Sequence, residues 1–388
     1  MKKKIVIISV IFVLLLTFFF DFSTHFTRVS AGKVEPVPYL ILKWGDGENE
    51  MGLSGPHEDF WYDGPATFDV DKEGNVYIVD QLHNRIVKVD KTGKVIDSID
   101  ISKIISKNDP NAKYSPIQLI VADRCMFLLH VYSFDLPPLD PYSYPLRYAS
   151  RYVSVITKSK IIKIDAQKLL GQPVDVRMDR LSGNKIVLTP SVPPEGLPTW
   201  KGPKAVIVNE NGETRIVKRL VNGSFDGITP GVDLLFNRYK DTWLYENTRI
   251  EVKDPKTGKP LFLSKPLENG APIDSLGLRF NSKKIVIMYQ TPGSENEETK
   301  TVTTHITVFN LHPKTEENYT MVIGEEDRKN MLPPPFVYRV NFVLGEDGYF
   351  YNMLYTKDGL LISRFEPEVS TTTYQYRFIK FTKSFGKN

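Results

Sequence analysis

The segment from Gly64 to Ile99 constrains the fold more than any other part of the chain. It reads GPATFDVDKEGNVYIVDQLHNRIVKVDKTGKVIDSI, in which short runs of alternating apolar residues are separated by turn residues. Residues 75–80 and 85–90 each alternate in this way, and residues 90–94 supply a tight turn. A four-stranded sheet of this length cannot bury both of its faces alone. The rest of the chain must therefore provide sheets that pack against it.

The same segment resembles the NHL repeat. The usual elements of that repeat are matched by Pro65, residues 68–71, Gly74-Asn75, residues 77–80, Asn84-Arg85-Ile86 and Gly93. Residues 41–45 also resemble the strand that closes the blade before an NHL repeat, so the strong match covers residues 41–99. The resemblance implies an all-β fold, a β-propeller whose blades are four-stranded antiparallel sheets.

Weaker repeats of the same pattern predict six blades. An X-Pro step that precedes extended apolar runs recurs at Pro65, Pro116, Pro173, Pro230, Pro272 and Pro335. Residues 248–259 repeat the order of residues 84–94, with Thr248 inserted between the Asn and the Arg. This internal echo is the best sign that the blade is repeated.

The last blade shows only three convincing strands after Pro335, and a spare strand lies at residues 39–44. We expect this N-terminal strand to complete the last blade and close the ring, because closure removes exposed sheet edges. The tail offers an alternative strand at residues 374–381. We assign residues 32–370 to one propeller and residues 371–388 to a C-terminal tail, since six blades of roughly 40 to 60 residues fill most of the chain.

The N-terminus predicts export. Three lysines precede a mostly apolar run at residues 5–20, and Val29-Ser30-Ala31 offers a place for signal peptidase to cut. We interpret residues 1–31 as a signal peptide or an N-terminal membrane anchor. In both cases the propeller lies outside the cytoplasm, either secreted or anchored at the membrane.

Charge and cysteine content argue against a nucleic-acid partner and against a reactive thiol. Without residues 1–31 the formal charge falls from +4 to +1, because four basic residues and one acidic residue are lost. A nearly neutral domain does not favour a nucleic-acid partner. The single cysteine, Cys125, lies in an apolar run and is interpreted as a buried, inert thiol. We expect a monomer.

No catalytic or metal-binding motif is present. The six histidines are scattered, without the spacing that places two imidazoles on one metal, and no nucleophile elbow or nucleotide-binding loop follows a strand. No cofactor is predicted. Calcium stays open as an alternative at Asp69, Asp71 and Glu73, although the order of ligands in an EF-hand is missing.

Candidate binding residues gather on one rim of the expected propeller. Insertions at residues 133–148, 190–203 and 291–303 occupy the slot between the second and third strands of their blades, which opens on the same rim as the links between blades. His83 and Arg85 lie in the corresponding turn of the first blade, where capping and packing are the alternative role. The candidate binding residues on this rim are Trp61, Tyr62, His83, Arg85, Tyr142, Tyr144, Tyr148 and Trp200.

These observations predict a binding module. Aromatic and proline-rich loops provide rigid apolar area that suits a protein or carbohydrate ligand, although the same aromatics could pack against one another. The alternative is a metal-dependent propeller enzyme, of the lactonase or lyase type, with a site in the central channel. A structural envelope protein that organises a larger assembly is a third reading. The sequence does not decide whether the chain is an enzyme, and no catalytic residue is assigned.

Overall fold

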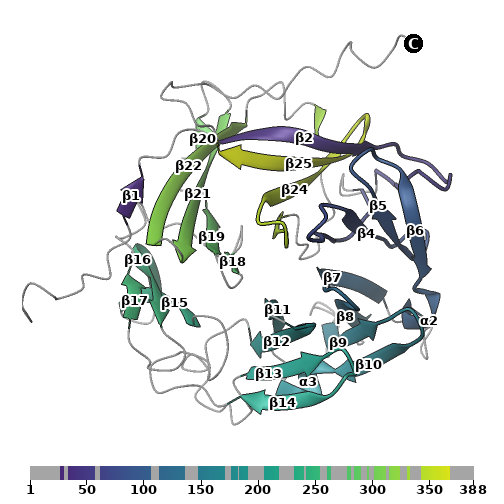
Figure 1. The fold of residues 1–388 in the computed structure, drawn as a ribbon, viewed down its shortest axis with the longest axis horizontal. Helices are drawn as coiled ribbons and strands as arrows, with labels where there is room; N and C mark the ends of the chain where they lie inside the picture. The colour runs from purple at the N-terminus through teal and green to yellow at the C-terminus, as the bar shows by residue number, and fades with distance from the viewer. Residues whose placement is uncertain are drawn as a thin grey trace, which may run out of the picture.

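The structure is a computed structural model, and most of the residues that it describes are in β-strands. The described residues are 27–29, 34–56, 62–105, 113–135, 147–170, 176–181, 183–190, 205–217, 231–239, 242–253, 260–263, 278–280, 284–289, 295–296, 301–311, 314–323, 330–332 and 342–367. Within them lie six sheets, four of which are four-stranded and antiparallel (Figure 1). The described part of the chain contains no helix long and apolar enough to cross a membrane. The all-β prediction is confirmed.

The segment that opened the sequence analysis forms one complete sheet. Its strands, in spatial and chain order, are β3 (Phe68–Val70), β4 (Val76–Asp80), β5 (Arg85–Val89) and β6 (Val95–Asp100). Its turns form for the expected reasons. The Asp71 side chain accepts a hydrogen bond from the Asn75 backbone at 2.8 Å, and the Asp90 side chain accepts one from the Thr92 backbone at 2.8 Å.

The next two sheets follow the same consecutive order. The second contains β7 (Lys113–Val121), β8 (Met126–Asp135), β9 (Arg147–Ile156) and β10 (Ile161–Asp165), and the third contains β11 (Val176–Leu181), β12 (Lys185–Pro190), β13 (Ala205–Asn209) and β14 (Thr214–Val217). Two short helices lie in the links before and after the second sheet, α2 (Ser102–Ile105) and α3 (Ala166–Leu170). Each link carries the chain from the last strand of one sheet to the first strand of the next.

Two further sheets are described at the level of strand pairing. One contains β15 (Gly231–Tyr239), β16 (Thr242–Lys253) and β17 (Pro260–Leu263). The other contains β18 (Leu278–Phe280), β19 (Lys284–Tyr289), β20 (Glu295–Asn296), β21 (Thr301–Leu311) and β22 (Lys314–Ile323). Strand β1 (Thr27–Val29) pairs parallel with β22, so part of the predicted leader adds a strand here.

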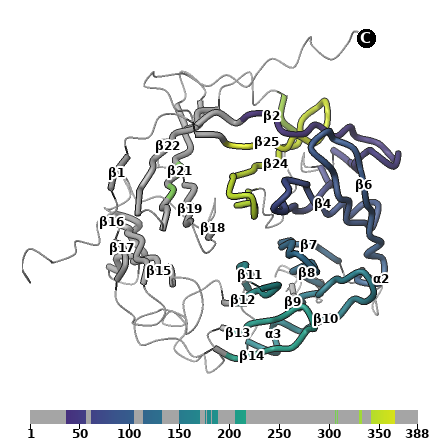
Figure 2. Tube along the Cα trace, viewed as in Figure 1, coloured from purple at the N-terminus to yellow at the C-terminus, as the bar shows by residue number. Residues whose placement is uncertain are grey.

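The last sheet combines both ends of the described chain. It contains β23 (Phe342–Leu344), β24 (Phe350–Thr356) and β25 (Gly359–Pro367), and β2 (Val34–Leu42) pairs antiparallel with β25. Figure 2 shows β2 and β25 side by side. The N-terminal segment thus supplies the fourth strand of the last sheet. This strand begins at Val34 rather than at Tyr39, because an outermost strand tolerates Pro36 and Pro38. Residues 374–381, the alternative fourth strand, lie outside the described residues.

Successive sheets stack face to face around a common centre, which is a β-propeller arrangement. The innermost strands β23, β3, β7 and β11 contact one another in that order. Separate apolar cores lie between the last and first, first and second, and second and third sheets. Val79 and Val76 of β4, for example, belong to the cores on opposite sides of the first sheet. The first and second sheets therefore bury both faces, as the sequence required of the first.

Candidate functional site

One end of the first and last sheets carries their connecting segments, and we call this end the loop rim. In the described residues it consists of residues 43–52, 81–84, 330–332 and 357–358. The Asn84 carbonyl accepts a hydrogen bond from the Ile101 backbone at 2.9 Å, and the Trp44 indole donates to the Thr356 carbonyl at 2.8 Å. Turns within sheets and links between sheets therefore meet at one end.

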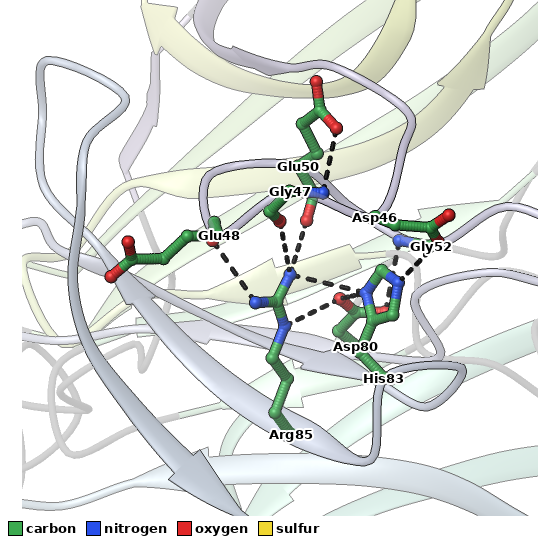
Figure 3. A network of polar contacts seen from close by, with 8 residues as sticks. All are labelled: Asp46, Gly47, Glu48, Glu50, Gly52, Asp80, His83 and Arg85. Atoms are coloured by element: carbon green, nitrogen blue, oxygen red, sulfur yellow. Dashed lines mark hydrogen bonds and ion pairs between the residues drawn. The ribbon is translucent and has the colours of Figure 1, made fainter.

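Arg85 fastens residues 43–52, which we call the held loop, to the first sheet (Figure 3). Its Nε donates to Asp80 Oδ2 at 3.1 Å. Its terminal nitrogens donate to the backbone carbonyls of Glu50 at 2.5 Å, Glu48 at 3.3 Å and Gly47 at 3.4 Å. A guanidinium has five N–H donors in a fixed plane, which suits several carbonyls of one loop.

His83 and Asp80 complete the same network. His83 Nδ1 lies 2.7 Å from Asp80 Oδ2, and His83 Nε2 lies 3.2 Å from Asp46 Oδ1. Burial, the largest single influence, lowers the pKa of His83, but the hydrogen bonds with Asp80 and Asp46 raise it, and the net shift is upward. The fully buried Asp80 also accepts from the Gly52 backbone at 3.3 Å.

The local sequence explains this arrangement. Asp80 and Arg85 are directly opposed in the β4–β5 ladder, so the hairpin itself brings carboxylate and guanidinium together. Asn84 closes the turn with a φ of 54°, a left-handed conformation that asparagine tolerates. A Cβ at Gly52 would lie 2.8 Å from the Leu82 Cβ, so only glycine allows the loop to approach this closely.

The network forms a rigid platform at the loop rim. The polar atoms of Asp80 and Arg85 are used to hold the loop, so both act as positioning residues. Outward from them, Asp46 and Glu48 are exposed and Leu82 is 39% exposed. The platform can therefore offer a ligand acidic and apolar contacts with little loss of loop entropy.

The structure brings together only some of the predicted binding residues. His83 and Arg85 share the network, and Tyr62 is half-buried against the core between the last and first sheets. Tyr148 lies in β9, opposite Phe134 of β8. Trp61, Tyr142, Tyr144 and Trp200 lie outside the described residues. Their role as a common binding surface stays a prediction.

A second charged cluster, which the sequence analysis missed, lies where the innermost strands meet. We call Asp69, Arg180 and Glu346 the axial triad. Arg180 of β11 donates to Asp69 of β3, and its other terminal nitrogen lies 3.3 Å from Glu346 Oε1, in the turn after β23. Asp69 Oδ2 also accepts from the Val121 backbone at 2.6 Å. Four sheets therefore meet at this triad.

Asp69 is buried and Glu346 is partly buried, and the pKa values of both carboxyl groups reflect this. Burial raises the pKa of Asp69, against the opposing effect of Arg180. Burial also raises the pKa of Glu346, which Arg180 again opposes. One sign of this cluster was present in the sequence: Asp69 is a charged residue at a buried position of an innermost strand.

The proposed calcium ligands have protein partners. Asp69 binds Arg180 and the Val121 backbone, whereas Asp71 accepts from the backbone and side-chain amides of Asn75 and lies 3.3 Å from the Lys88 ammonium. The described residues contain no group of three or more His, Cys, Asp or Glu side chains placed to hold a metal ion. Cys125 is buried, which raises the pKa of its thiol to about 11.

In comparisons with known proteins, solved structures align with most of the chain, but at low sequence identity. No family model and no curated protein matches it. A DUF4221 family member from Bacteroides vulgatus has 12% identity and a TM-score of 0.43, covering 87% of this chain and 99% of that one. Virginiamycin B lyase from Staphylococcus aureus has 14% identity and a TM-score of 0.34, covering 82% and 100%. The WD40 domain of SCAP from fission yeast has 8% identity and a TM-score of 0.28, covering 88% and 96%.

Proposed function

We propose that this chain is an exported, NHL-like β-propeller that binds a protein or carbohydrate ligand at the cell surface through its loop rim. It acts as a monomer, secreted or anchored by its N-terminal apolar segment. The propeller has six blades, and β2 closes the ring. The six sheets in chain order and the β2–β25 pairing support this architecture. The residue pattern of 41–99 supports the NHL likeness.

One observation carries the binding proposal: Arg85 holds three backbone carbonyls of a single rim loop. A loop without such contacts would lose much conformational entropy on binding a ligand. Arg85 holds the loop in place, and Asp46, Glu48 and the nearby turn residue Leu82 are exposed. A positioned loop on the rim where the sequence predicts aromatic insertions is typical of a binding surface.

Binding of the full-length chain to cell-wall glycans and to surface proteins tests the proposal. One variant carries Tyr142→Ala, Tyr144→Ala and Trp200→Ala, and a second carries Asp46→Asn and Leu82→Ala. We expect either to weaken retention by about tenfold or more, as for residues at the centre of an interface. Lys94→Ala, an exposed change at the opposite end of the first sheet, is the matched control. If all three variants were retained as well as the wild type, the loop rim would be removed as the binding surface.

The enzymatic alternative needs carboxylates that converge on an open cation site in the central channel. In the described residues, the carboxylates of Asp69 and Glu346 instead contact the guanidinium of Arg180. An arginine that already neutralises them favours a structural role for these three residues. Metal analysis of the purified chain distinguishes the two functions, because a stoichiometric ion would favour the enzyme.

A further inference from the structure

An aromatic cluster lies on the face of the second sheet that is turned toward the first. Leu128 of β8 packs in the core between these two sheets, and the alternate residues His130 and Tyr132 continue the same face toward the loop rim. Tyr114 of β7 and Tyr152 of β9 join them, with ring centroids 5.3 Å and 5.9 Å from that of His130. The cluster therefore spans three neighbouring strands.

Two of these rings surround a positive charge. The rings of Tyr132 and Tyr152 stand at 81° to each other with centroids 5.5 Å apart. The Lys163 ammonium lies 4.1 Å from the Tyr132 centroid and 4.3 Å from the Tyr152 centroid. Both distances are within the range of a cation–π contact, and perpendicular rings that share one cation form two walls of an aromatic cage.

Lys163 is a replaceable occupant of these rings. It lies on β10, the outermost strand of the sheet, and the residue as a whole is exposed. The described residues provide no carboxylate that forms an ion pair with it. Burial of the ammonium lowers its pKa more than the charge of Asp165, on the same strand, raises it, so the charged group is less stable here than in water. A primary ammonium is strongly hydrated, and its partial desolvation opposes binding between the rings.

We propose that Tyr132 and Tyr152 form a binding site for a methylated ammonium group, such as that of choline, which displaces Lys163. Methylation lowers the hydration of the cation while its attraction to the aromatic faces remains, and aromatic cages bind such groups for this reason. Because Lys163 is tethered, it competes with the ligand at a high effective concentration. A free primary amine is as strongly hydrated as Lys163 and is therefore not expected to displace it.

Unsatisfied polar atoms beside the rings support a ligand at this place. His130 is fully buried, its Nε2 lies 2.9 Å from Ser154 Oγ, and its Nδ1 has no hydrogen-bond partner in the part of the chain that the structure describes. The Tyr114 hydroxyl is likewise buried without a partner among those residues. Such groups are rare in native proteins. They can bond a polar group of the ligand, or a water that accompanies it.

The position of the tyrosine pair connects it to the proposed loop rim. The Tyr132 hydroxyl donates to the Ile104 carbonyl in α2, the link that leaves the first sheet at the rim. The strands that carry both tyrosines continue into residues 136–146, the insertion that contains Tyr142 and Tyr144. This inference rests on the proposed ligand-binding function and names one chemical group of the ligand.

Titration of the full-length chain with tetramethylammonium chloride, followed by calorimetry and tyrosine fluorescence, tests the proposal. Sodium chloride at the same ionic strength is the reference. We expect weak binding by the wild type and at least about tenfold tighter binding by Lys163→Ala, because the tethered competitor is gone. Adding Tyr152→Leu to Lys163→Ala should abolish binding, with circular dichroism to confirm the fold. Lys160→Ala, an exposed lysine in the preceding turn, should match the wild type.

Two results would overturn this site: binding by Lys163→Ala no tighter than that by wild type, or binding that survives Tyr152→Leu. Retention on glycans and surface proteins is a separate measurement, so loss of the cation site leaves the loop-rim proposal standing. Comparison of soluble phosphocholine with phosphatidylcholine vesicles identifies the source of the group. Binding of the soluble compound alone indicates a choline-bearing polymer, whereas binding of both indicates that a lipid head group is also accepted.

Discussion

Arg180 donates a hydrogen bond to Asp69 from the innermost strand of the third sheet to that of the first, past the second sheet that lies between them in the chain. The same guanidinium reaches Glu346 of the last sheet. Among the described residues the apolar cores join neighbouring sheets, whereas this arginine joins three sheets near the centre. The axial triad is therefore a direct tie between sheets that do not follow one another.

We predict that Arg180→Met destabilises the fold. Asp69 is 3% exposed, and loss of its cationic partner leaves a buried carboxylate that must either stay uncompensated or take up a proton. The free energy of unfolding should fall by about 3 kcal/mol, the magnitude expected for breaking a buried pair by removing one partner. Urea denaturation at neutral pH measures the change.

An exposed ion pair serves as the control for Arg180→Met. Arg124 lies 3.1 Å from Glu210, but its side chain is 73% exposed. Arg124→Met should therefore change the free energy of unfolding by less than about 1 kcal/mol. A similar effect for both arginines would contradict the structural role of the triad.

Turn residues and apolar alternation predicted the strands well, but they predicted the pairing of distant strands much less well. Glycines with positive φ at positions 74 and 93 close turns that the alternating pattern already indicated. The N-terminal closing strand was predicted from a missing partner, but its start was not, because Pro36 and Pro38 resemble strand breakers. Strand β1 lies within residues 1–31 and carried no strand signal. Its parallel pairing with β22 joins positions as far apart in the sequence as Thr27 and Thr315.

In the candidate site, too, the sequence indicated single residues but not their distant partners. His83 and Arg85 stood out as polar residues in a turn, but the carbonyls that Arg85 binds belong to Gly47, Glu48 and Glu50, and every residue type has a carbonyl. Asp69 and Arg180 are 111 residues apart. Their contact follows only from the order in which the sheets surround the centre, which no local pattern encodes.

Arg85→Lys should loosen the held loop while the sheet stays intact. A lysine ammonium cannot reproduce a planar fork that reaches Asp80 and several carbonyls at once. Amide hydrogen exchange in residues 43–52 should become faster by about tenfold, the effect of losing roughly 1.4 kcal/mol of local stability. Exchange in β4 should not change. Unchanged protection of the loop would show that other contacts hold it.

His130 should make the protein sensitive to acid. Burial, together with the nearby charge of Lys163, lowers the pKa of His130 from 6.5 to about 3. The unfolded chain therefore binds a proton below pH 6.5 that the folded chain does not bind. The contribution of neutral His130 to stability is complete above pH 6.5 and decreases as the pH falls toward 3, by up to about 1.4 kcal/mol for each pH unit. Urea denaturation between pH 7.5 and 5 should show a smaller slope for His130→Gln, and equal slopes would refute the prediction.

His83 should contribute with the opposite sign. Its pKa is raised in the fold by Asp80 and Asp46, although burial opposes the shift. Its contribution to stability is therefore complete below pH 6.5 and is lost as the pH rises through the folded pKa. NMR titration of the histidine ring should give a pKa above 6.5, and Asp46→Asn should lower it. A ring that titrates below 6.5 would mean that desolvation outweighs the two carboxylates.

Gly359→Ala tests how closely the N-terminal strand is docked. Gly359 begins β25 with a φ of 152°, and a Cβ at this position would lie 2.4 Å from the Leu42 carbonyl oxygen at the end of β2. Because this neighbour is backbone, the clash can be relieved only if the two strands separate. Gly93→Ala is the matched control, since Gly93 also has a positive φ but its Cβ would meet no atom within 4 Å. The control should lose about 1 kcal/mol from backbone strain alone, whereas Gly359→Ala should lose more and should speed hydrogen exchange in residues 39–42. Equal losses for the two variants would mean that β2 can move away from β25 at little cost, and the proposed ring closure by the N-terminal strand would lose its main support.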